Sequence, residues 1–167
     1  MLSISAIVRI ATAKDIQSIL ELSKEFHTCG TALFNENERK LFKYKKNHFS
    51  ILKKFLGKWI RSRKAKVFVA EADGSIVGFM IATMNKLASV YEHSHEIHIE
   101  GLFIREGYRR GGIGKKLISQ AETWAKEQGI YSIGLTVLVK NKNAFSAYKK
   151  MGFWAHNYKM SKIIGKG

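Results

Sequence analysis

The chain has 167 residues and carries 29 Lys and Arg against 13 Asp and Glu, a formal net charge of +16. Its one cysteine, Cys29, excludes an internal disulfide framework and a multi-cysteine zinc site, which favours a reducing, cytoplasmic location. No export signal is recognisable and no apolar run approaches the roughly 20 residues that span a bilayer, so we expect a soluble protein without a membrane partner.

The first half of the chain predicts a strand, two helices and a hairpin within a single domain, residues 1–167. A strand over residues 6–10 leads to a helix from about Asp15 to Phe26. A second, amphipathic helix should turn an apolar stripe toward the core. That stripe consists of Leu52, Phe55, Leu56, Trp59 and Ile60.

Asp73 and Gly74 predict a tight hairpin turn, because both residues tolerate a positive φ. Apolar runs over residues 67–72 and 76–83 flank this turn and should form two antiparallel strands. The next apolar run, from Ile97 to Ile104, supplies a further strand.

The second half of the chain predicts an alternation of helices and strands. A helix beginning at Ile113 should bury Ile113, Leu117, Ala121 and Trp124. Residues 130–139 are rich in apolar and β-branched side chains, which suits a largely buried, central strand. A short helix after Asn141 and a last strand from Phe153 to Met160 complete the prediction.

A glycine-rich loop joins the strand ending at Ile104 to the helix beginning at Ile113. Its sequence is Tyr108-Arg109-Arg110-Gly111-Gly112-Ile113-Gly114-Lys115-Lys116. Backbone N–H groups at a helix start lack intrahelical partners, the helix dipole adds partial positive charge there, and glycine lets a phosphate approach the backbone closely. The loop therefore predicts a site for a phosphorylated ligand.

Three other phosphate-binding motifs fit this loop less well. A Walker loop aligned on Gly107 and Gly112 would have Ile113 where its lysine is required. A dinucleotide fingerprint finds Leu117 in place of its third glycine. The G-x-x-G of a KH domain joins two helices, whereas a predicted strand precedes this loop.

The pattern Arg109-x-x-Gly112-x-Gly114 resembles the [QR]-x-x-G-x-[GA] signature of the GCN5-related N-acetyltransferases, the GNAT superfamily. Downstream, Asn141-Lys142-Asn143-Ala144-Phe145-Ser146-Ala147-Tyr148-Lys149-Lys150-Met151-Gly152-Phe153 is similar to that family's N-x-x-A-x-x-x-Y-x-x-x-G-F segment at every fixed position. Upstream, Val8 to Ile16 is similar to the family's opening strand and first helix. The resemblance is strongest from Ile97 to Phe153 and poorest from Gly30 to Lys66.

The resemblance implies an α/β fold with a mixed, mostly antiparallel sheet and helices on both of its faces. The strands ending near Ile104 and Val139 would be parallel neighbours that splay apart, forming a wedge for the pantetheine arm of acetyl-CoA. The resemblance further implies direct transfer of an acetyl group from acetyl-CoA, the co-substrate, to a primary amine.

The family resemblance also implies which residues bind acetyl-CoA. Its pyrophosphate would lie on the backbone amides of the glycine loop, and its pantetheine arm would pair with the strand backbone near Leu102. The expected residues are Leu102, Phe103, Ile104, Arg109, Arg110, Gly111, Gly112, Ile113, Gly114, Lys115, Asn141, Ala144 and Tyr148. Asn141 can also N-cap the short helix, and Gly152 can end that helix in a left-handed conformation.

Acetyl transfer to an amine needs one group that accepts the amine's proton and one that protonates the departing thiolate. Glu100 is the predicted base and Tyr148 the predicted acid, while a backbone N–H near Leu102 would stabilise the oxyanion. His98 is the alternative base, because it titrates near neutrality and would share a face with Glu100 on a regular strand. Glu100 could instead bind the acceptor or be a solvated carboxylate.

Three histidines, His93, His95 and His98, lie close together in the sequence. On a regular strand the first two point one way and His98 the other, so we expect no metal site. The sequence His98-Ile99-Glu100 is similar to the H-x-E of zinc deaminases, but the P-C-x-x-C that those enzymes need cannot occur in a chain with one cysteine and no proline.

Residues 34–66 hold twelve Lys and Arg against two acidic residues, interleaved with Phe42, Tyr44, Phe49, Phe55 and Trp59. This region could contact nucleic acid, recruit an acidic partner, or be a solvated lysine-rich face. The overall charge would repel free polycations unless Glu92, Glu96 and Glu100 form an acidic mouth, which favours a peptide or protein amine as acceptor. A polyamine-type small-amine acetyltransferase, a non-catalytic nucleic-acid-binding module and a homodimer stay open.

Overall fold

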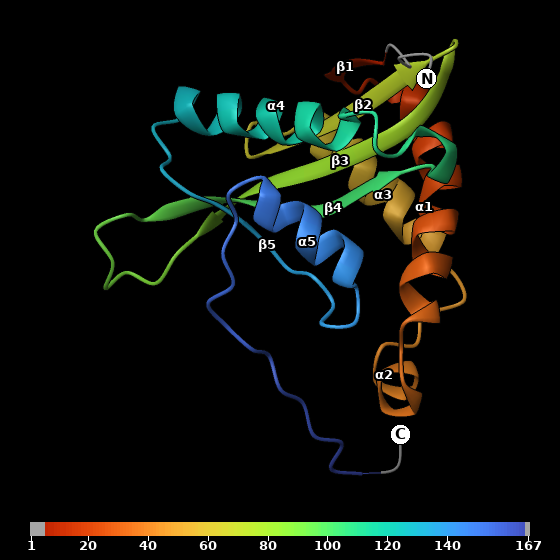
Figure 1. Cartoon of the computed structure of the whole chain (residues 1–167), viewed down its shortest axis with the longest axis vertical. Helices are drawn as coiled ribbons and strands as arrows, with labels where there is room; N and C mark the ends of the chain where they lie inside the picture. Colours follow the sequence, from red (N-terminus) through yellow and green to blue (C-terminus); the bar gives the residue numbers. More distant parts are fainter. Residues whose placement is uncertain (1–5, 166–167) are drawn as a thin grey trace.

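The computed structural model describes residues 6–165, in which five strands form one sheet in the order β1-β2-β3-β4-β5 (Figure 1). The strands are β1 (Ile7–Ile10), β2 (Ala65–Ala72), β3 (Ser75–Lys86), β4 (His95–Ile104) and β5 (Ile133–Leu135). The helices are α1 (Ile16–Ala32), α2 (Glu36–Leu41), α3 (His48–Ile60), α4 (Ile113–Glu127) and α5 (Lys142–Lys150). Neighbouring strands are antiparallel except β4 and β5, which run parallel. The predicted mixed, mostly antiparallel sheet is therefore confirmed.

The hairpin between β2 and β3 turns at the predicted residues. Asp73 has a φ of 51° and Gly74 a φ of 71°, left-handed values that most residues avoid. From Ala72 and Ser75 onward the two strands pair antiparallel, and β3 pairs in turn with β4. Local turn chemistry thus places β2 and β3 side by side.

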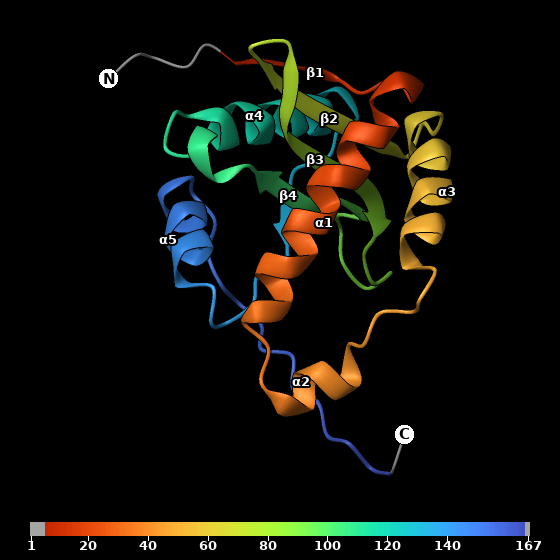
Figure 2. The ribbon, with the colours of Figure 1, turned by 90° about the vertical axis from the view of Figure 1, so that its right-hand side faces the viewer.

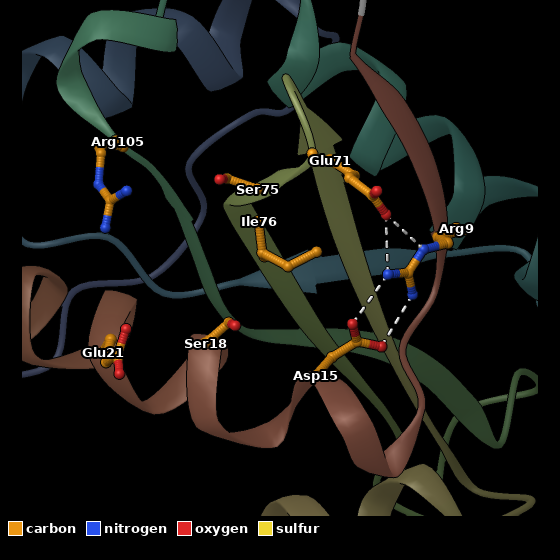
Figure 3. A pocket seen from close by; sticks show the side chains of 9 residues that line it. Arg9, Asp15, Ser18, Glu21, Glu71, Ser75, Ile76 and Arg105 are labelled. Carbon is orange, nitrogen blue, oxygen red and sulfur yellow. Dashed lines mark hydrogen bonds and ion pairs between the residues drawn. The ribbon is translucent and has the colours of Figure 1, made fainter.

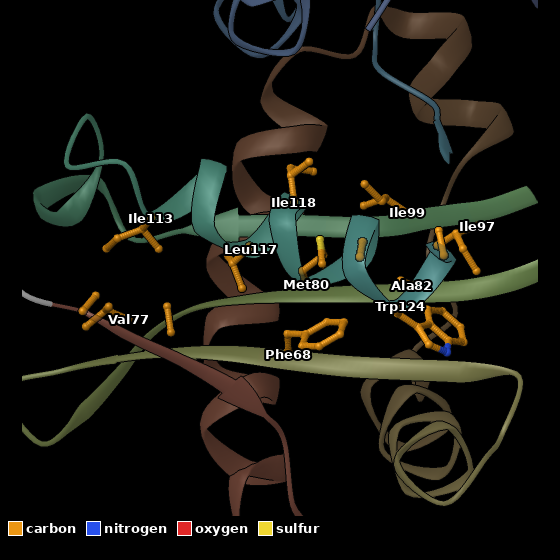
Figure 4. Packing of buried hydrophobic residues seen from close by; sticks show 14 of the residues in the cluster. Phe68, Val77, Met80, Ala82, Ile97, Ile99, Ile113, Leu117, Ile118 and Trp124 are labelled. Atoms are coloured by element: carbon orange, nitrogen blue, oxygen red, sulfur yellow. The ribbon is translucent and has the colours of Figure 1, made fainter. Parts of the chain in front are cut away.

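Alternating side chains of the sheet form two apolar layers. On one face, Met80 packs in a cluster with Leu117 and Trp124 of α4 (Figure 4). On the other face, Phe79 packs in a cluster with Leu56 of α3 and with side chains of α1. Because Met80 and Phe79 are consecutive in β3, they point to opposite faces. Helices therefore cover both faces, and the four predicted core residues of α4 are all buried.

Helix α3 buries its predicted apolar stripe only in part. Leu56 is completely buried, but Phe55 is 47% exposed and its ring stacks on Trp59 instead, with 5.4 Å between ring centroids. The expectation that Phe55 faces the core is wrong. The helix packs on β2 and α1, and the strip that they cover is narrower than the apolar stripe.

Helices α1 and α2 differ from the sequence prediction. α1 continues several residues beyond its predicted end, to Ala32, and the hydroxyls of Thr28 and Thr31 donate to carbonyls one turn back along it. α2 was not predicted, although its capping box is visible in the sequence. The Asn35 side chain accepts from the Glu38 N–H at 2.9 Å, and the Glu38 carboxylate accepts from the Asn35 N–H at 2.6 Å.

Two strand predictions in the second half of the chain are wrong, one in its extent and one altogether. β5 covers three residues rather than 130–139 and is an edge strand, not a central one, while Val139 is 67% exposed. In the described part of the chain, residues 153–160 form no strand, and Trp154 and Met160 are 79% and 90% exposed. Apolar alternation makes a strand only where a neighbouring strand supplies hydrogen-bond partners.

Stacked rings hold the loop between α2 and α3 against α1. The ring of Tyr44 lies 4.5 Å from that of His27 at an interplanar angle of 9°, and the rings of His48 and Phe49 lie 5.6 and 5.5 Å from His27. Nδ1 of His27 is buried and has no hydrogen-bond partner in the described residues. Burial, with a smaller contribution from His48, lowers the pKa of His27, so the folded protein favours its neutral ring.

This depressed pKa predicts a loss of stability on acidification. The unfolded chain takes up the His27 proton near the usual histidine pKa of about 6.5, whereas the folded chain resists it, so stability is present above that pH and is lost as the pH falls below it. His27→Phe keeps an aromatic ring in the stack, and it should make the free energy of unfolding, measured with urea between about pH 5 and 8, depend less on pH. His156→Phe, which replaces an exposed histidine, should leave this pH dependence as it is in the wild type. If the two variants show the same pH dependence, His27 is not its source.

Candidate active site

Strands β4 and β5 part after three residue pairs. Their parallel pairing ends at Ile99, while β4 continues to Ile104 and stays paired with β3 on its other side. Within the described chain, one edge of residues 100–104 therefore has no strand partner, and its backbone groups can pair with an extended ligand. The predicted splayed pair is confirmed, and the open stretch contains Leu102, Phe103 and Ile104.

The glycine loop presents open backbone at the start of α4. Gly112, the residue before α4, has a φ of 80° and Arg110 a φ of 67°, and left-handed residues at the start of a right-handed helix shape an anion-binding concavity. A methyl group added to Gly112 would meet no atom within 4 Å, and one added to Gly111 would meet only the Tyr108 carbonyl oxygen, at 3.9 Å. The Lys116 N–H donates to the Gly112 carbonyl at 3.0 Å, so the N–H groups before it are available to an anion.

Arg109 holds this loop against the end of β4. Its Nε donates to the carbonyl oxygen of Ile104 at 2.7 Å, and its guanidinium carbon lies 5.5 Å from the centroid of the Phe103 ring. The side chain is thus engaged with the protein itself. This contact places the backbone of the loop beside the open stretch of β4.

Of the other residues of the loop, two pack against the protein and two are exposed to solvent. Ile113 is buried in the core, and a methyl group added to Gly114 would come 3.4 Å from Cδ1 of Ile104, so both residues fix the start of α4 on the sheet. Arg110 and Lys115 are exposed and form no ion pair within residues 6–165. Their charges can meet an anion at the helix start.

The segment after β5 forms the predicted short helix, α5. The Asn141 side chain accepts from the Ala144 N–H at 3.2 Å, and Gly152, beyond the helix end, has a φ of 93°. Tyr148 is half-buried, with its ring in edge contact with Phe153 at 5.7 Å. Burial raises the pKa of the Tyr148 phenol. Figure 2 shows α5 below the carboxyl end of β4 and the start of α4.

Glu100 lies at a β-bulge. The register of β3 against β4 skips it, so that Glu100 stands as an extra residue between Ile99 and Gly101. Its carboxylate is exposed and accepts a hydrogen bond from the Thr83 hydroxyl at 2.6 Å. Thr83 was missed by the sequence analysis, because only the register of β3 and β4 brings it to Glu100.

His98, the alternative base, is tied to Glu96, with 3.4 Å between Nδ1 and Oε1. The Glu96 carboxylate lies over Gly134 of β5, where an added methyl group would come 2.6 Å from a carboxylate oxygen. His98 pairs with Gly134 where the strands are still joined, whereas Glu100 lies where they have parted. The geometry therefore favours Glu100 as the carboxylate at the open stretch.

The other two histidines lie away from this stretch. His93 and His95 line a hollow together with Glu92 and Tyr131, and the rings of His93 and Tyr131 are 4.9 Å apart. Among residues 6–165, no three His, Cys, Asp or Glu side chains are placed to hold a metal ion. Glu92 thus lines this hollow rather than the open stretch of β4.

A second hollow contains a cluster of paired charges (Figure 3). The Arg9 guanidinium donates to both carboxylate oxygens of Asp15 at 2.9 Å and to Glu71 at 3.1 Å. The hydrogen bonds from Arg9 lower the pKa of Asp15 to about 2. Because these three charges satisfy one another, the cluster joins β1, β2 and the start of α1 and is no second anion cradle.

The sequence matches known acetyltransferases. A model of the Acetyltransferase (GNAT) family matches residues 16–153. The chain is 35% identical over 97 residues to an uncharacterised N-acetyltransferase of Methanocaldococcus jannaschii, covering 58% of this chain and 42% of that protein. It is 32% identical over 109 residues to an N-alpha-acetyltransferase of Sulfurisphaera tokodaii, covering 59% of this chain and 62% of that protein. The chain therefore spans less than two thirds of the length of either relative.

The fold matches solved structures at low sequence identity. A variant of a Bacillus halodurans protein superposes with a TM-score of 0.79 and 20% identity, covering 95% of this chain and 99% of that one. An aminoglycoside N-acetyltransferase in complex with CoA superposes with a TM-score of 0.72 and 16% identity, covering 96% and 100%. These structures share the fold of this chain.

Gly111 offers a test of the cradle without backbone strain, because its φ lies outside the left-handed region and the space around it is open. Gly111→Leu should weaken acetyl-CoA binding at least about tenfold, since the side chain would occupy the place of the pyrophosphate. Calorimetric titration at two salt concentrations separates this from general attraction to a basic protein. Gly107→Leu, equally unhindered, is the matched control, and unchanged affinity in Gly111→Leu would rule out the cradle.

Proposed function

The chain belongs to the GNAT family of acetyltransferases, and on that basis we propose that it moves the acetyl group of acetyl-CoA to a primary amine of a peptide or protein. Acetyl-CoA-dependent transfer to an amine follows from the family. The class of acceptor is inferred from the position and charge of the segment that contains α2.

An ion pair brings α2 to the rim of the wedge. Nζ of Lys140, in the loop between β5 and α5, lies 3.4 Å from Oε2 of Glu38 in α2. This contact supports a position of α2, and of the lysines that follow it in the chain, beside the loop between β5 and α5. A positively charged rim repels a free polycation. It does not repel a peptide whose amine is surrounded by neutral residues, and it attracts one with acidic residues there. The Glu38–Lys140 contact is the observation that carries the peptide proposal.

The relatives support two acceptor classes. The Sulfurisphaera tokodaii relative is an N-alpha-acetyltransferase, which agrees with a peptide α-amine. An aminoglycoside N(6')-acetyltransferase of Salmonella typhimurium, 25% identical over 87 residues, covers 52% of this chain and 60% of that protein, and represents the small polycationic class. The net charge of +16 favours the peptide, so a small amine is the second candidate.

In the proposed reaction the acceptor enters as an ammonium ion, because the pKa of a lysine amine is about 10 and that of a peptide α-amine is about 8. Glu100 accepts its proton, directly or through one water, while the Thr83 hydroxyl holds one carboxylate oxygen at 2.6 Å. The neutral amine then attacks the acetyl carbonyl and forms the C–N bond, and a backbone N–H near Leu102 stabilises the resulting oxyanion. The C–S bond breaks as the oxyanion collapses, and Tyr148 protonates the departing thiolate. The nitrogen loses its second proton, which restores the Tyr148 phenol directly or through water, and Glu100 releases its proton to solvent.

The raised pKa of Tyr148 suits this role, because the phenol is then protonated at neutral pH and can donate its proton to the thiolate. A proton transfer of this kind contributes about a hundredfold to ten-thousandfold to a rate. The wedge and the cradle contribute by positioning the reactants, an effect that can be larger. His98, which lies beside Glu96, is the alternative base.

We assign these steps to one N-acetyltransferase domain that works in the cytoplasm. No helix among residues 6–165 has the length and apolar character needed to cross a membrane. The one cysteine, Cys29, is exposed as a free thiol, which suits a reducing compartment. The scheme needs no residue from a second subunit.

Replacing the two proton carriers should lower turnover but not acetyl-CoA affinity. Glu100→Gln should reduce kcat about a hundredfold, and Tyr148→Phe should reduce kcat about tenfold or more. Glu122→Gln, on the exposed side of α4, is the matched carboxylate control. Normal kcat in either site variant would assign its step to His98 or to water.

A panel of acceptors tests the substrate class. We expect kcat/KM at least about tenfold higher for peptides with a free amine than for polyamines or aminoglycosides, with the difference shrinking as salt screens the repulsion. Lys43→Glu combined with Lys45→Glu, next to α2, should raise kcat/KM for polyamines. A wild-type preference for a polycation would overturn the peptide proposal and favour the small-amine acetyltransferase.

A further inference from the structure

The outer side of α3 is more basic than acetyl transfer requires. No Asp or Glu occurs between Arg39 and Ala70, a stretch that holds twelve Lys and Arg. Of these twelve, only Lys40 pairs with a carboxylate in the described chain. This stretch therefore has almost no counter-charges within the part of the protein that the structure describes. Its cations repel one another, because like charges one turn apart on a helix are unfavourable.

The exposed side of α3 combines cations with an aromatic pair. Lys54, Lys58 and Arg61 follow at spacings of four and three residues, so they form one stripe along the exposed side of the helix. Phe55 borders this stripe and is 47% exposed, and its ring stacks on Trp59 at an interplanar angle of 29°. Solvation explains exposed lysines, but it does not explain an exposed phenylalanine beside them.

This surface is separate from the acetyl-transfer site. α3 packs on β2 and α1, whereas the wedge opens between β4 and β5. Figure 2 shows α3 at one side of the molecule, with α5 and the start of α4 at the other. A ligand on the outer side of α3 would leave the wedge accessible.

We propose that the outer side of α3 binds single-stranded nucleic acid, with Lys54, Lys58 and Arg61 on the phosphates and Phe55 with Trp59 stacking on the bases. Cations that follow a sugar-phosphate backbone next to exposed aromatic rings are the usual means of binding single strands. In a duplex the bases are already stacked on one another and cannot reach the rings. An acidic protein would match the charge but would offer no bases to stack on the exposed face of this aromatic pair.

The test uses the full chain and labelled twelve-nucleotide RNA and DNA single strands, a duplex of the same length, and polyglutamate. Fluorescence anisotropy between about 50 and 200 mM salt gives the affinities. Phe55→Ala keeps every charge and should weaken single-strand binding about fivefold to a hundredfold, the range of one base stack. Lys54→Gln with Lys58→Gln should weaken binding and reduce the salt slope by about 1.4, or about 0.7 for each phosphate that is no longer neutralised.

One control tests for general attraction to a basic protein, and a second tests whether the variant is still folded. Lys14→Gln with Lys126→Gln removes the same charge from exposed positions outside α3 and should change binding much less. Acetyl-CoA affinity and circular dichroism should be unchanged in Phe55→Ala, which shows that the fold and the acetyl-transfer site are intact.

Four results would overturn the proposal. Equal losses in both lysine pairs would show general attraction without a site. Unchanged single-strand affinity in Phe55→Ala, or a duplex that binds as tightly as the single strands, would exclude stacking. Polyglutamate that binds as tightly as RNA would indicate an acidic protein instead. Since acetyl-CoA binding and turnover are measured separately, failure here leaves the acetyltransferase proposal standing.

Discussion

The unequal pairing of the two edges of β4 is the constraint on which the proposed site depends. One edge pairs with β3 up to Ile104, whereas the other pairs with β5 only as far as Ile99. An unpaired backbone edge is normally a liability in a sheet, because its N–H and C=O groups need partners. Beside an anion cradle, the same edge can accept an extended, amide-bearing ligand.

Packing on both faces keeps this half-paired strand in place. Ile97 and Ile99 are buried beneath α4, while Phe103 is buried beneath α1, and a fully buried apolar side chain of this size contributes about 1.5–3 kcal/mol. The Phe26 ring of α1 lies beside Gly101, where an added methyl group would come 3.5 Å from it. The Arg109 bond to Ile104 then fixes the cradle to the end of the same strand. Wedge and cradle are therefore positioned by one strand.

Charge is divided between two regions of the molecule. Arg9 with Asp15 and Glu71, and Arg105 with Glu25, form mixed ion pairs around β1, β2 and α1. The region from α2 to the start of β2 has cations with almost no acids. The first arrangement neutralises itself and supports the fold. The second leaves most of its cations without carboxylate partners in the described chain, which is the basis for the two ligands proposed for α2 and α3.

The sequence by itself determined the features that depend only on residues adjacent in the chain. The Asp73-Gly74 turn needs positive φ, the cradle needs glycine at a φ of 80°, and Asn141 caps α5 with its own side chain, so each has a signature a few residues long. Tertiary structure alone decided the short β5, the unpaired residues 153–160, the exposure of Phe55 and the bond from Thr83 to Glu100. These features depend on which distant segment lies alongside, and a strand exists only where such a neighbour completes its hydrogen bonds.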